Sequence, residues 1–158
     1  MIQKTEHKYL HRCVELAREA LAAGDEPFGS VLVDAKGNIR AEDRNRVAGG
    51  DETRHPEFEL ARWAANHMTA DERAGSTVYT SGEHCPMCAA AHGWVRLGRI
   101  VYAVSSKQLG AWLAEIGVAP GPVRSFPASE IAPGVTVEGP VPEFAEEMHA
   151  LHLRAHGK

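Results

Sequence analysis

The sequence predicts an α/β domain with a layered architecture. Strand-like and helix-like segments alternate through the middle of the chain, which is typical of a sheet with helices packed on its faces and at least one parallel pair of strands. The chain has 158 residues, of which 44% are hydrophobic and 24% are charged. This length and composition suffice for one domain with its own core. We therefore expect residues 1–158 to form a single domain.

The first third of the chain predicts a helix and then a hairpin. Apolar residues recur every three or four positions between residues 5 and 23, as on one face of an amphipathic helix. Residues 29–34 form a short apolar run, and a turn with Gly37 separates them from residues 39–42, an expected antiparallel partner. Residues 45–54 are rich in glycine and polar residues, so we expect a loop there.

The middle of the chain carries the alternation. A helix is expected over residues 56–67, because proline is tolerated in a first helical turn and the apolar residues that follow have helical spacing. Further elements are expected in this order: a strand over 77–80, a helix over 86–96, a strand over 99–104 and a helix over 107–116.

The last part of the chain has a different composition. Six of the nine prolines lie between Gly117 and the final helix, which excludes a long regular element there, although residues 134–137 are compatible with a short edge strand. A final helix is expected from Pro142, with Phe144, Met148 and Leu151 on one face. We divide the domain into a core over residues 1–117 and an arm over 118–158, whose helix folds back or is exchanged between subunits.

Composition excludes several classes of protein. There is no apolar run of the roughly 18–20 residues that a membrane span requires, and no apolar segment behind the N-terminus that is typical of a secreted protein. With a net charge of −4 the chain does not attract the phosphates of nucleic acid, so we do not expect a nucleic-acid partner. Three cysteines do not form a closed disulfide framework, so a cytoplasmic protein with a metal or redox site is expected.

The residues most informative about chemistry are His55, Cys85 and Cys88. The strand over 77–80 and the helix over 56–67 fit between His55 and Cys85, so both segments can meet at neighbouring helix N-termini. One imidazole and two thiolates suit tetrahedral Zn²⁺ and leave a position open, as in a catalytic zinc site. Structural zinc or a redox dithiol are the alternatives. His92 is a further conceivable ligand, and Cys13 is expected in the core.

Glu57 follows His55 by two residues, so it can border the open coordination position without being a ligand. A carboxylate there can accept a proton from a bound water and return it to a substrate. We therefore expect Glu57 to be the catalytic acid and base.

These motifs resemble the cytidine deaminase-like superfamily of zinc-dependent nucleobase deaminases, whose signature is H-x-E followed by P-C-x-x-C. Within it, the chain is most similar to the branch of bacterial guanine deaminases and tRNA adenosine deaminases. The resemblance covers about residues 5–117. It is carried, in chain order, by Pro27–Val33, Asn45–Val47, His55–Glu57, Thr80–Cys88 and Leu97–Tyr102.

The resemblance implies a three-layer α/β/α domain with a mixed five-stranded sheet, forming a homodimer. It implies hydrolytic deamination of an aminated heterocycle, with Zn²⁺ activating water, Glu57 protonating a ring nitrogen, and ammonia leaving. It also implies that Asn45 orients the base. Phe28 and Trp94 are expected as walls of the pocket, with a role as core residues as the alternative.

The sequence departs from the family pattern at three places. Pro56 stands where alanine is usual, and His84 stands where proline usually precedes the first cysteine; His84 is expected either behind the metal ligands or at the surface. Guanine deaminases of this type carry an acidic stretch that here corresponds to 117–120, without a carboxylate. This places guanine itself in doubt. Glu143 or Glu146 could supply the carboxylate from the last helix, or lie on a solvated face.

The leading hypothesis is a deaminase of a free base, with cytosine-, isoguanine- or aminotriazine-like rings as alternatives to guanine. A tRNA adenosine deaminase is the second hypothesis, supported by a basic cluster of Arg40, Arg44, Arg46 and Arg54. A dCMP-type deaminase is third, since the sequence offers no convincing phosphate-binding loop. A zinc-stabilised binding module is the non-enzyme alternative, although it would have no use for Glu57.

Overall fold

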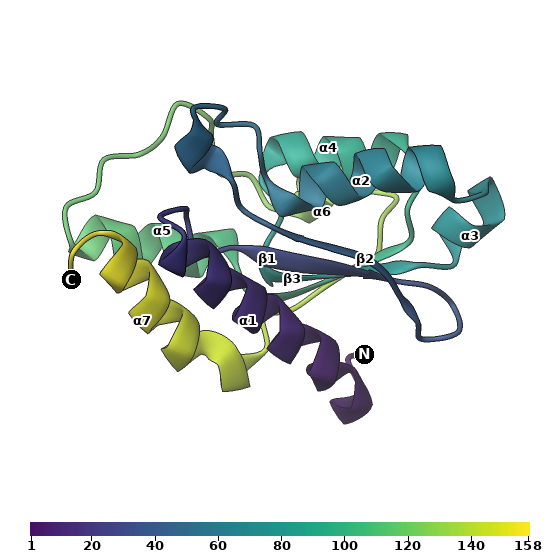
Figure 1. Ribbon diagram of the computed structural model, residues 1–158, viewed down its shortest axis with the longest axis horizontal. Helices are drawn as coiled ribbons and strands as arrows, with labels where there is room; N and C mark the ends of the chain where they lie inside the picture. Colours follow the sequence, from purple (N-terminus) through teal and green to yellow (C-terminus); the bar gives the residue numbers. More distant parts are fainter.

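The protein has a five-stranded mixed sheet between two layers of helices (Figure 1). The computed structural model describes all 158 residues. The strand order is β2-β1-β3-β4-β5; β1 pairs antiparallel with both β2 and β3, and β4 pairs parallel with β3 and β5. The predicted α/β/α fold with a mixed five-stranded sheet is confirmed. The strands are β1 (Gly29–Val33), β2 (Ile39–Arg44), β3 (Thr77–Gly82), β4 (Arg99–Val104) and β5 (Val137–Glu138).

One face of the sheet is covered by α1 (His7–Ala22), which a short 3₁₀ turn, η1 (Lys4–Glu6), precedes. The apolar stripe of α1 is buried with side chains of β1, β3 and α7 in one core cluster. Gly29 begins β1 where the strand meets α1: a Cβ there would lie 2.4 Å from the backbone oxygen of Cys13 and from the Cβ of Leu16. The helix and the strand therefore approach at a distance that only glycine permits.

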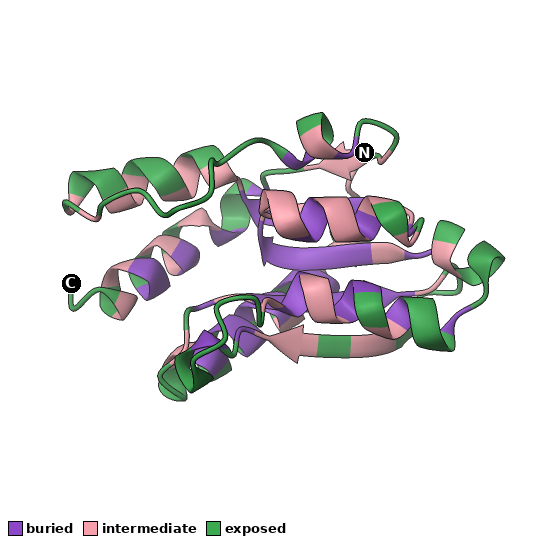
Figure 2. Ribbon diagram, turned by 90° about the horizontal axis from the view of Figure 1, so that it is seen from above, coloured by how far each residue is buried: buried purple, intermediate pink, exposed green.

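The other face is covered by α2 (Pro56–His67) and α4 (Pro86–Trp94). A second core cluster, which includes Leu32, Leu60 and Val78, lies between this helix layer and the sheet. Figure 2 shows that buried residues are concentrated in the central strands β1, β3 and β4 and on parts of these helices. Both helices begin where the preceding segment arrives at the same end of the sheet, which brings their N-termini together.

The arm after β4 contains α5 (Ser106–Glu115), α6 (Ala128–Ile131), β5, η3 (Pro142–Phe144) and α7 (Ala145–Ala155). Within the chain α7 packs against α1 and α5. The expected edge strand occurs at Val137–Glu138. Exchange of α7 between subunits stays a prediction.

Three short elements were absent from the sequence-based expectation: η2 (Val47–Gly49), α3 (Ala70–Ala74) and α6. Each has five residues or fewer, which is too short for helical periodicity to show in the sequence. No helix of the protein is long and apolar enough to cross a membrane.

Candidate zinc site and substrate cavity

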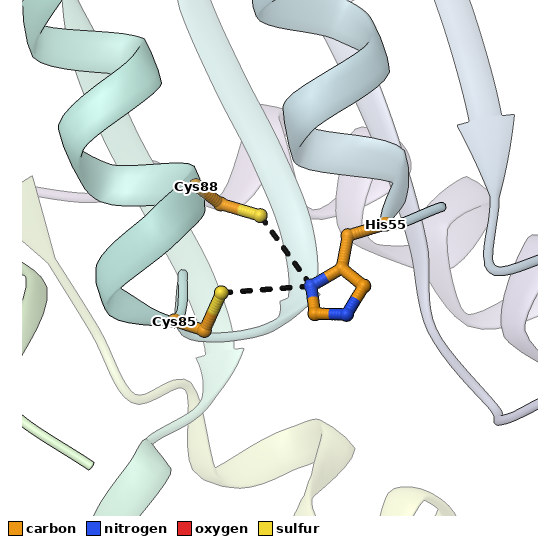
Figure 3. A group of neighbouring side chains, drawn as sticks. All are labelled: His55, Cys85 and Cys88. Atoms are coloured by element: carbon orange, nitrogen blue, oxygen red, sulfur yellow. Dashed lines mark hydrogen bonds between the residues drawn. The ribbon is translucent and has the colours of Figure 1, made fainter. Parts of the chain in front are cut away.

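His55 and Cys85 each lie at the position immediately before a helix. His55 precedes α2 and Cys85 precedes α4, both with extended backbone, and Pro56 and Pro86 start the two helices. Proline favours a first helical turn because its missing N–H has no partner there in any case. Cys88 lies one turn into α4. Figure 3 shows the three side chains pointing toward one another from the two helix N-termini.

The geometry of these side chains fits zinc. The Nδ1 atom of His55 lies 3.5 Å from the Sγ atom of Cys85 and 3.5 Å from that of Cys88. Tetrahedral zinc, with Zn–S near 2.3 Å and Zn–N near 2.0 Å, requires an N···S separation of about 3.5 Å. All three donor atoms lie within 4.8 Å of one another. His55, Cys85 and Cys88 therefore form a candidate site for Zn²⁺.

The two thiols affect each other's protonation. The hydrogen bond from Cys88 and that with His55 lower the pKa of Cys85 to about 4, whereas the hydrogen bond with Cys85 and burial raise the pKa of Cys88 far above its usual value. Without a metal, one thiolate thus prevents ionisation of the other. A divalent cation removes this repulsion and allows both sulfurs to act as thiolate ligands.

Glu57 lies in the first turn of α2, where its side chain is buried. Its Oε1 atom accepts hydrogen bonds from the hydroxyls of Thr80, at 2.8 Å, and Ser30, at 3.2 Å. Burial raises the pKa of Glu57. Neither hydroxyl bonds to the Oε2 atom, so Oε2 is the oxygen available to exchange a proton. Ser30 and Thr80 had not been predicted as supports of this carboxylate.

A cavity of about 650 Å³ connects these groups. Its lining includes metal ligands, the predicted Glu57, Asn45 and Phe28, and the exposed segment after α5. The cavity is deep enough to enclose an aromatic heterocycle, because ligand sites of this kind commonly measure about 300–1,000 Å³. It contains three carboxylates, those of Glu26, Glu57 and Glu83.

Asn45 is buried and presents a defined end of its amide to the cavity. Its Oδ1 atom accepts the backbone N–H of Val47, at 3.1 Å, and that of Glu26, at 3.3 Å. Because these two donors assign the oxygen, the Nδ2 group, which has no partner in the chain, is left with two N–H donors. Asn45 therefore offers donors, not an acceptor, to a bound molecule.

Phe28 lines the cavity and faces His152 of α7, with ring centroids 5.0 Å apart. Burial lowers the pKa of His152 to about 4, so the ring is neutral at neutral pH. The imidazole makes no hydrogen bond within the chain. No motif in the sequence marks His152, although it lies four residues after Met148, on the helical face predicted to be buried.

Two predicted substrate contacts lie elsewhere. Trp94 is 83% exposed at the end of α4 and does not line the cavity. Glu143 is held on the outer side of α1, where its Oε2 lies 2.5 Å from Nδ1 of His7. Neither side chain therefore lines the cavity of its own chain, and a role for either in substrate binding stays a prediction.

Two further histidines near the site pack against each other. His92 does not belong to the group of donor atoms at the candidate zinc site, and its Nε2 lies 2.7 Å from the backbone oxygen of Gly98. His84 is completely buried, with its ring edge-on to that of His92 at 5.4 Å between centroids and with no hydrogen bond. It is therefore not a surface residue. Cys13 is buried in the core, as predicted.

Comparison with known proteins identifies the family. Residues 3–104 match the cytidine and deoxycytidylate deaminase zinc-binding region. The chain belongs to this family. The resemblance predicted from the motifs is thereby confirmed, and the matched residues contain the three candidate zinc ligands and Glu57.

Several members of the deaminase family are similar over the core. A guanine deaminase of Bacillus subtilis is 40% identical over 97 residues, which are 60% of this chain and 62% of that protein. A tRNA-specific adenosine deaminase of Haemophilus influenzae is 36% identical over 107 residues, 67% of this chain and 62% of that protein. A probable cytosine deaminase of Schizosaccharomyces pombe is 32% identical over 101 residues, 64% and 61% of the two chains. The matches thus span just over three fifths of each relative.

Among solved structures, a guanine deaminase from Nitrosomonas europaea matches with a TM-score of 0.76 at 21% identity, over 100% of this chain and 88% of that chain. At this identity the match shows the fold. It extends through the arm, so the path of the chain after β4 is also shared.

Proposed function

We propose that the protein is a zinc-dependent hydrolytic deaminase of a free nucleobase or a related aminated heterocycle, and that it releases ammonia. The observation that carries the proposal is that His55, Cys85 and Glu57 line one cavity together with Asn45, while the donor atoms of His55 and Cys85 lie within 4.8 Å of the Cys88 sulfur. When bound, Zn²⁺ lowers the pKa of a coordinated water to about 7 and makes hydroxide available at neutral pH.

The acid and base work falls to Glu57. Thr80 and Ser30 hold its Oε1 atom and leave Oε2 free of these two hydroxyls, in a residue that lines the cavity. We assign to Oε2 the removal of a proton from the attacking water and its delivery to the ring nitrogen beside the amine-bearing carbon. The hydroxyl that the water has added to that carbon then gives its proton, through the same carboxylate, to the amine nitrogen; the C–N bond breaks, a carbonyl forms and ammonia leaves.

Orientation of the ring falls to Asn45 and Phe28. The two N–H donors of Asn45 require an acceptor on the substrate, such as a carbonyl oxygen or an unprotonated ring nitrogen. Phe28 and the neutral ring of His152 offer aromatic surfaces at the cavity wall. Guanine, isoguanine, cytosine and aminotriazines all carry suitable acceptors.

The cavity carboxylates bear on which ring is bound. The stretch 117–120 contributes Val118, Ala119 and Pro120 to the wall, so no carboxylate reaches the substrate from there. Of the three cavity carboxylates, those of Glu57 and Glu83 already accept hydrogen bonds, whereas the side chain of Glu26 has no partner. Glu26, instead of Glu143, is therefore the group that could accept from an amino or N–H edge. If Glu26 does not reach the ring, the amino and N–H groups of guanine have no acceptor in the cavity. Guanine should then bind more weakly than rings that lack these groups.

A tRNA substrate is the alternative, as the relative from Haemophilus influenzae is tRNA-specific by name. The basic cluster expected to support it is compensated by acidic neighbours. The pairs are Arg40 with Asp34 and Glu72, Arg44 with Asp25, Arg46 with Asp43, and Arg54 with Glu59. These arginines therefore offer little free positive charge to phosphates, which favours a small-molecule substrate.

We also propose that the protein acts as a homodimer.

The proposal is tested by measuring ammonia release from a panel of free bases, nucleosides and tRNA, with zinc content measured on the same sample. We expect about one zinc per chain and activity on at least one free base. Activity confined to tRNA would establish the alternative. Zinc without ammonia from any member of the panel would leave a zinc-stabilised binding module.

A further inference from the structure

Glu83 follows β3 and connects two parts of the chain that are far apart in sequence. Its Oε1 atom accepts the backbone N–H of Ser106, at 2.9 Å, and its Oε2 atom accepts that of Ala128, at 2.8 Å. Ser106 is the first residue of α5 and Ala128 is the first residue of α6. One carboxylate therefore joins the starts of both helices, and charge makes each of these hydrogen bonds stronger than a neutral one.

The segment between α5 and α6, residues 116–127, is here called the strap. In Figure 1 it is the green loop that arches from the end of α5 to α6. Val118 to Ser125 line the substrate cavity, yet residues 119–127 are all exposed. Between Ala119 and Ser125 the only backbone hydrogen bond lies within the strap itself, from the N–H of Phe126 to the oxygen of Arg124. The strap is thus held at its two ends.

The end at Val118 is held by its N–H, which bonds to the backbone oxygen of Leu113 in α5. The other end is held where Ala128 meets Glu83, and Ala128 is completely buried. The third contact, to Ser106, fixes Glu83 itself relative to α5. Loss of the Glu83 carboxylate would therefore free one end of the strap while leaving the zinc ligands and Glu57 in place.

We propose that Glu83 is a positioning residue that holds the strap as one wall of the substrate cavity. Both of its oxygens are occupied by backbone N–H groups, so it acts through the strap and not by contact with the substrate. The assignment of the cavity to a substrate rests on the proposed function; the tether itself does not. Loosening the strap is expected to weaken substrate binding more than the chemical step.

The strap contains a convenient reporter. Arg124 is the only lysine or arginine between Lys107 and Arg154, and it is exposed. Trypsin cleavage after Arg124 therefore reports how often the strap opens, and cleavage needs no substrate. Proteolysis of a locally opened segment follows the population of the open form.

The test compares the zinc-loaded wild type with Glu83→Gln and Glu83→Ala. Glutamine keeps the size of the side chain but offers one acceptor oxygen and places an NH₂ group against the other N–H donor. We expect cleavage after Arg124 to be faster by about 10-fold or more in Glu83→Gln, and faster again in Glu83→Ala. Glu130→Gln is the matched control, since Glu130 is exposed on α6 and makes no side-chain hydrogen bond; its cleavage should equal that of the wild type.

Unchanged cleavage in both Glu83 variants would overturn the proposal. So would cleavage that rises equally after Arg73 and Arg99, because that pattern reports general loosening of the domain. If deaminase activity is found, the KM of Glu83→Gln should rise while kcat stays within about two-fold. Absence of activity would contradict the proposed function but leave the cleavage result to decide the role of Glu83.

Discussion

At the scale of single residues, the side chains of Asn45 and Glu57 are each oriented by hydrogen bonds to one of their two polar atoms. Oδ1 of Asn45 is held by two backbone N–H groups and Oε1 of Glu57 by two hydroxyls. In both side chains one polar atom is committed to the fold and the other remains for a ligand. This arrangement determines the direction of each hydrogen bond to the substrate, which a sequence motif does not specify.

Glu57→Gln should retain about one zinc per chain and lose turnover by roughly 10²–10⁴-fold, because the amide cannot carry the proton. Ammonia release and metal content measured on one preparation test this. Glu59→Gln, a change of the same kind on the same helix outside the site, should keep full activity. Substantial turnover by Glu57→Gln would show that Glu57 is not the catalytic acid and base.

Asn45→Asp tests the polarity of the second group. The substituted side chain retains an oxygen for the backbone N–H groups of Val47 and Glu26, so the fold should persist. The Nδ2 group, with its two N–H donors, is replaced by a carboxylate oxygen, which can only accept. We therefore expect kcat/KM for the best base to fall by at least about 10²-fold. Asn66→Asp, on the exposed side of α2, serves as the control. A variant with nearly normal kcat/KM would show that Asn45 does not donate to the substrate.

At the scale of secondary-structure elements, the sequence was most informative where spacing and chemistry coincide. The helices that carry His55 and Cys85 could be predicted because proline, zinc ligands and apolar stripes all indicate the same starts. Trp94 and Glu143 could not be placed, because the direction of a helix end and the path of a proline-rich arm depend on tertiary packing. His152 was missed because imidazole on an apolar face is normally interpreted as part of the core.

The contact between α1 and β1 can be tested at Gly29. Gly29→Ala would place a Cβ 2.4 Å from the backbone oxygen of Cys13, so either the helix or the strand must move. We expect a loss of about 1–3 kcal/mol in the free energy of unfolding, measured with denaturant. Gly49→Ala is the matched control, since a Cβ at Gly49 has no neighbour within 4 Å. Equal stability of the two variants would contradict the close approach.

At the scale of the whole molecule, buried histidines connect stability to pH. Burial lowers the pKa of His92 and of His152 to about 4, below the ordinary value of 6.5. Both rings are neutral in the folded protein, whereas the unfolded chain takes up protons below pH 6.5. Their contribution to stability is therefore complete above pH 6.5 and is lost as the pH falls from 6.5 to 4.

Each of these two histidines should cost up to about 3 kcal/mol of folding free energy over that interval. His152→Phe, which cannot take up a proton, should make the unfolding free energy less steep between pH 6.5 and 4. His156→Phe, at an exposed position, should keep the slope of the wild type. Denaturant titrations at several pH values measure both, and identical slopes for the two variants would refute this origin of acid sensitivity.

The two edges of the sheet have a consequence for association. At one edge, four of the six residues of β2 are charged, and Arg12 of α1 bonds to Glu42 at 2.7 and 2.9 Å. At the other edge, β5 has two residues. A charged strand and a very short one are both poor templates for adding a strand from another molecule. The sheet therefore ends within one chain, and copies of this protein that assemble must do so through their helices and loops.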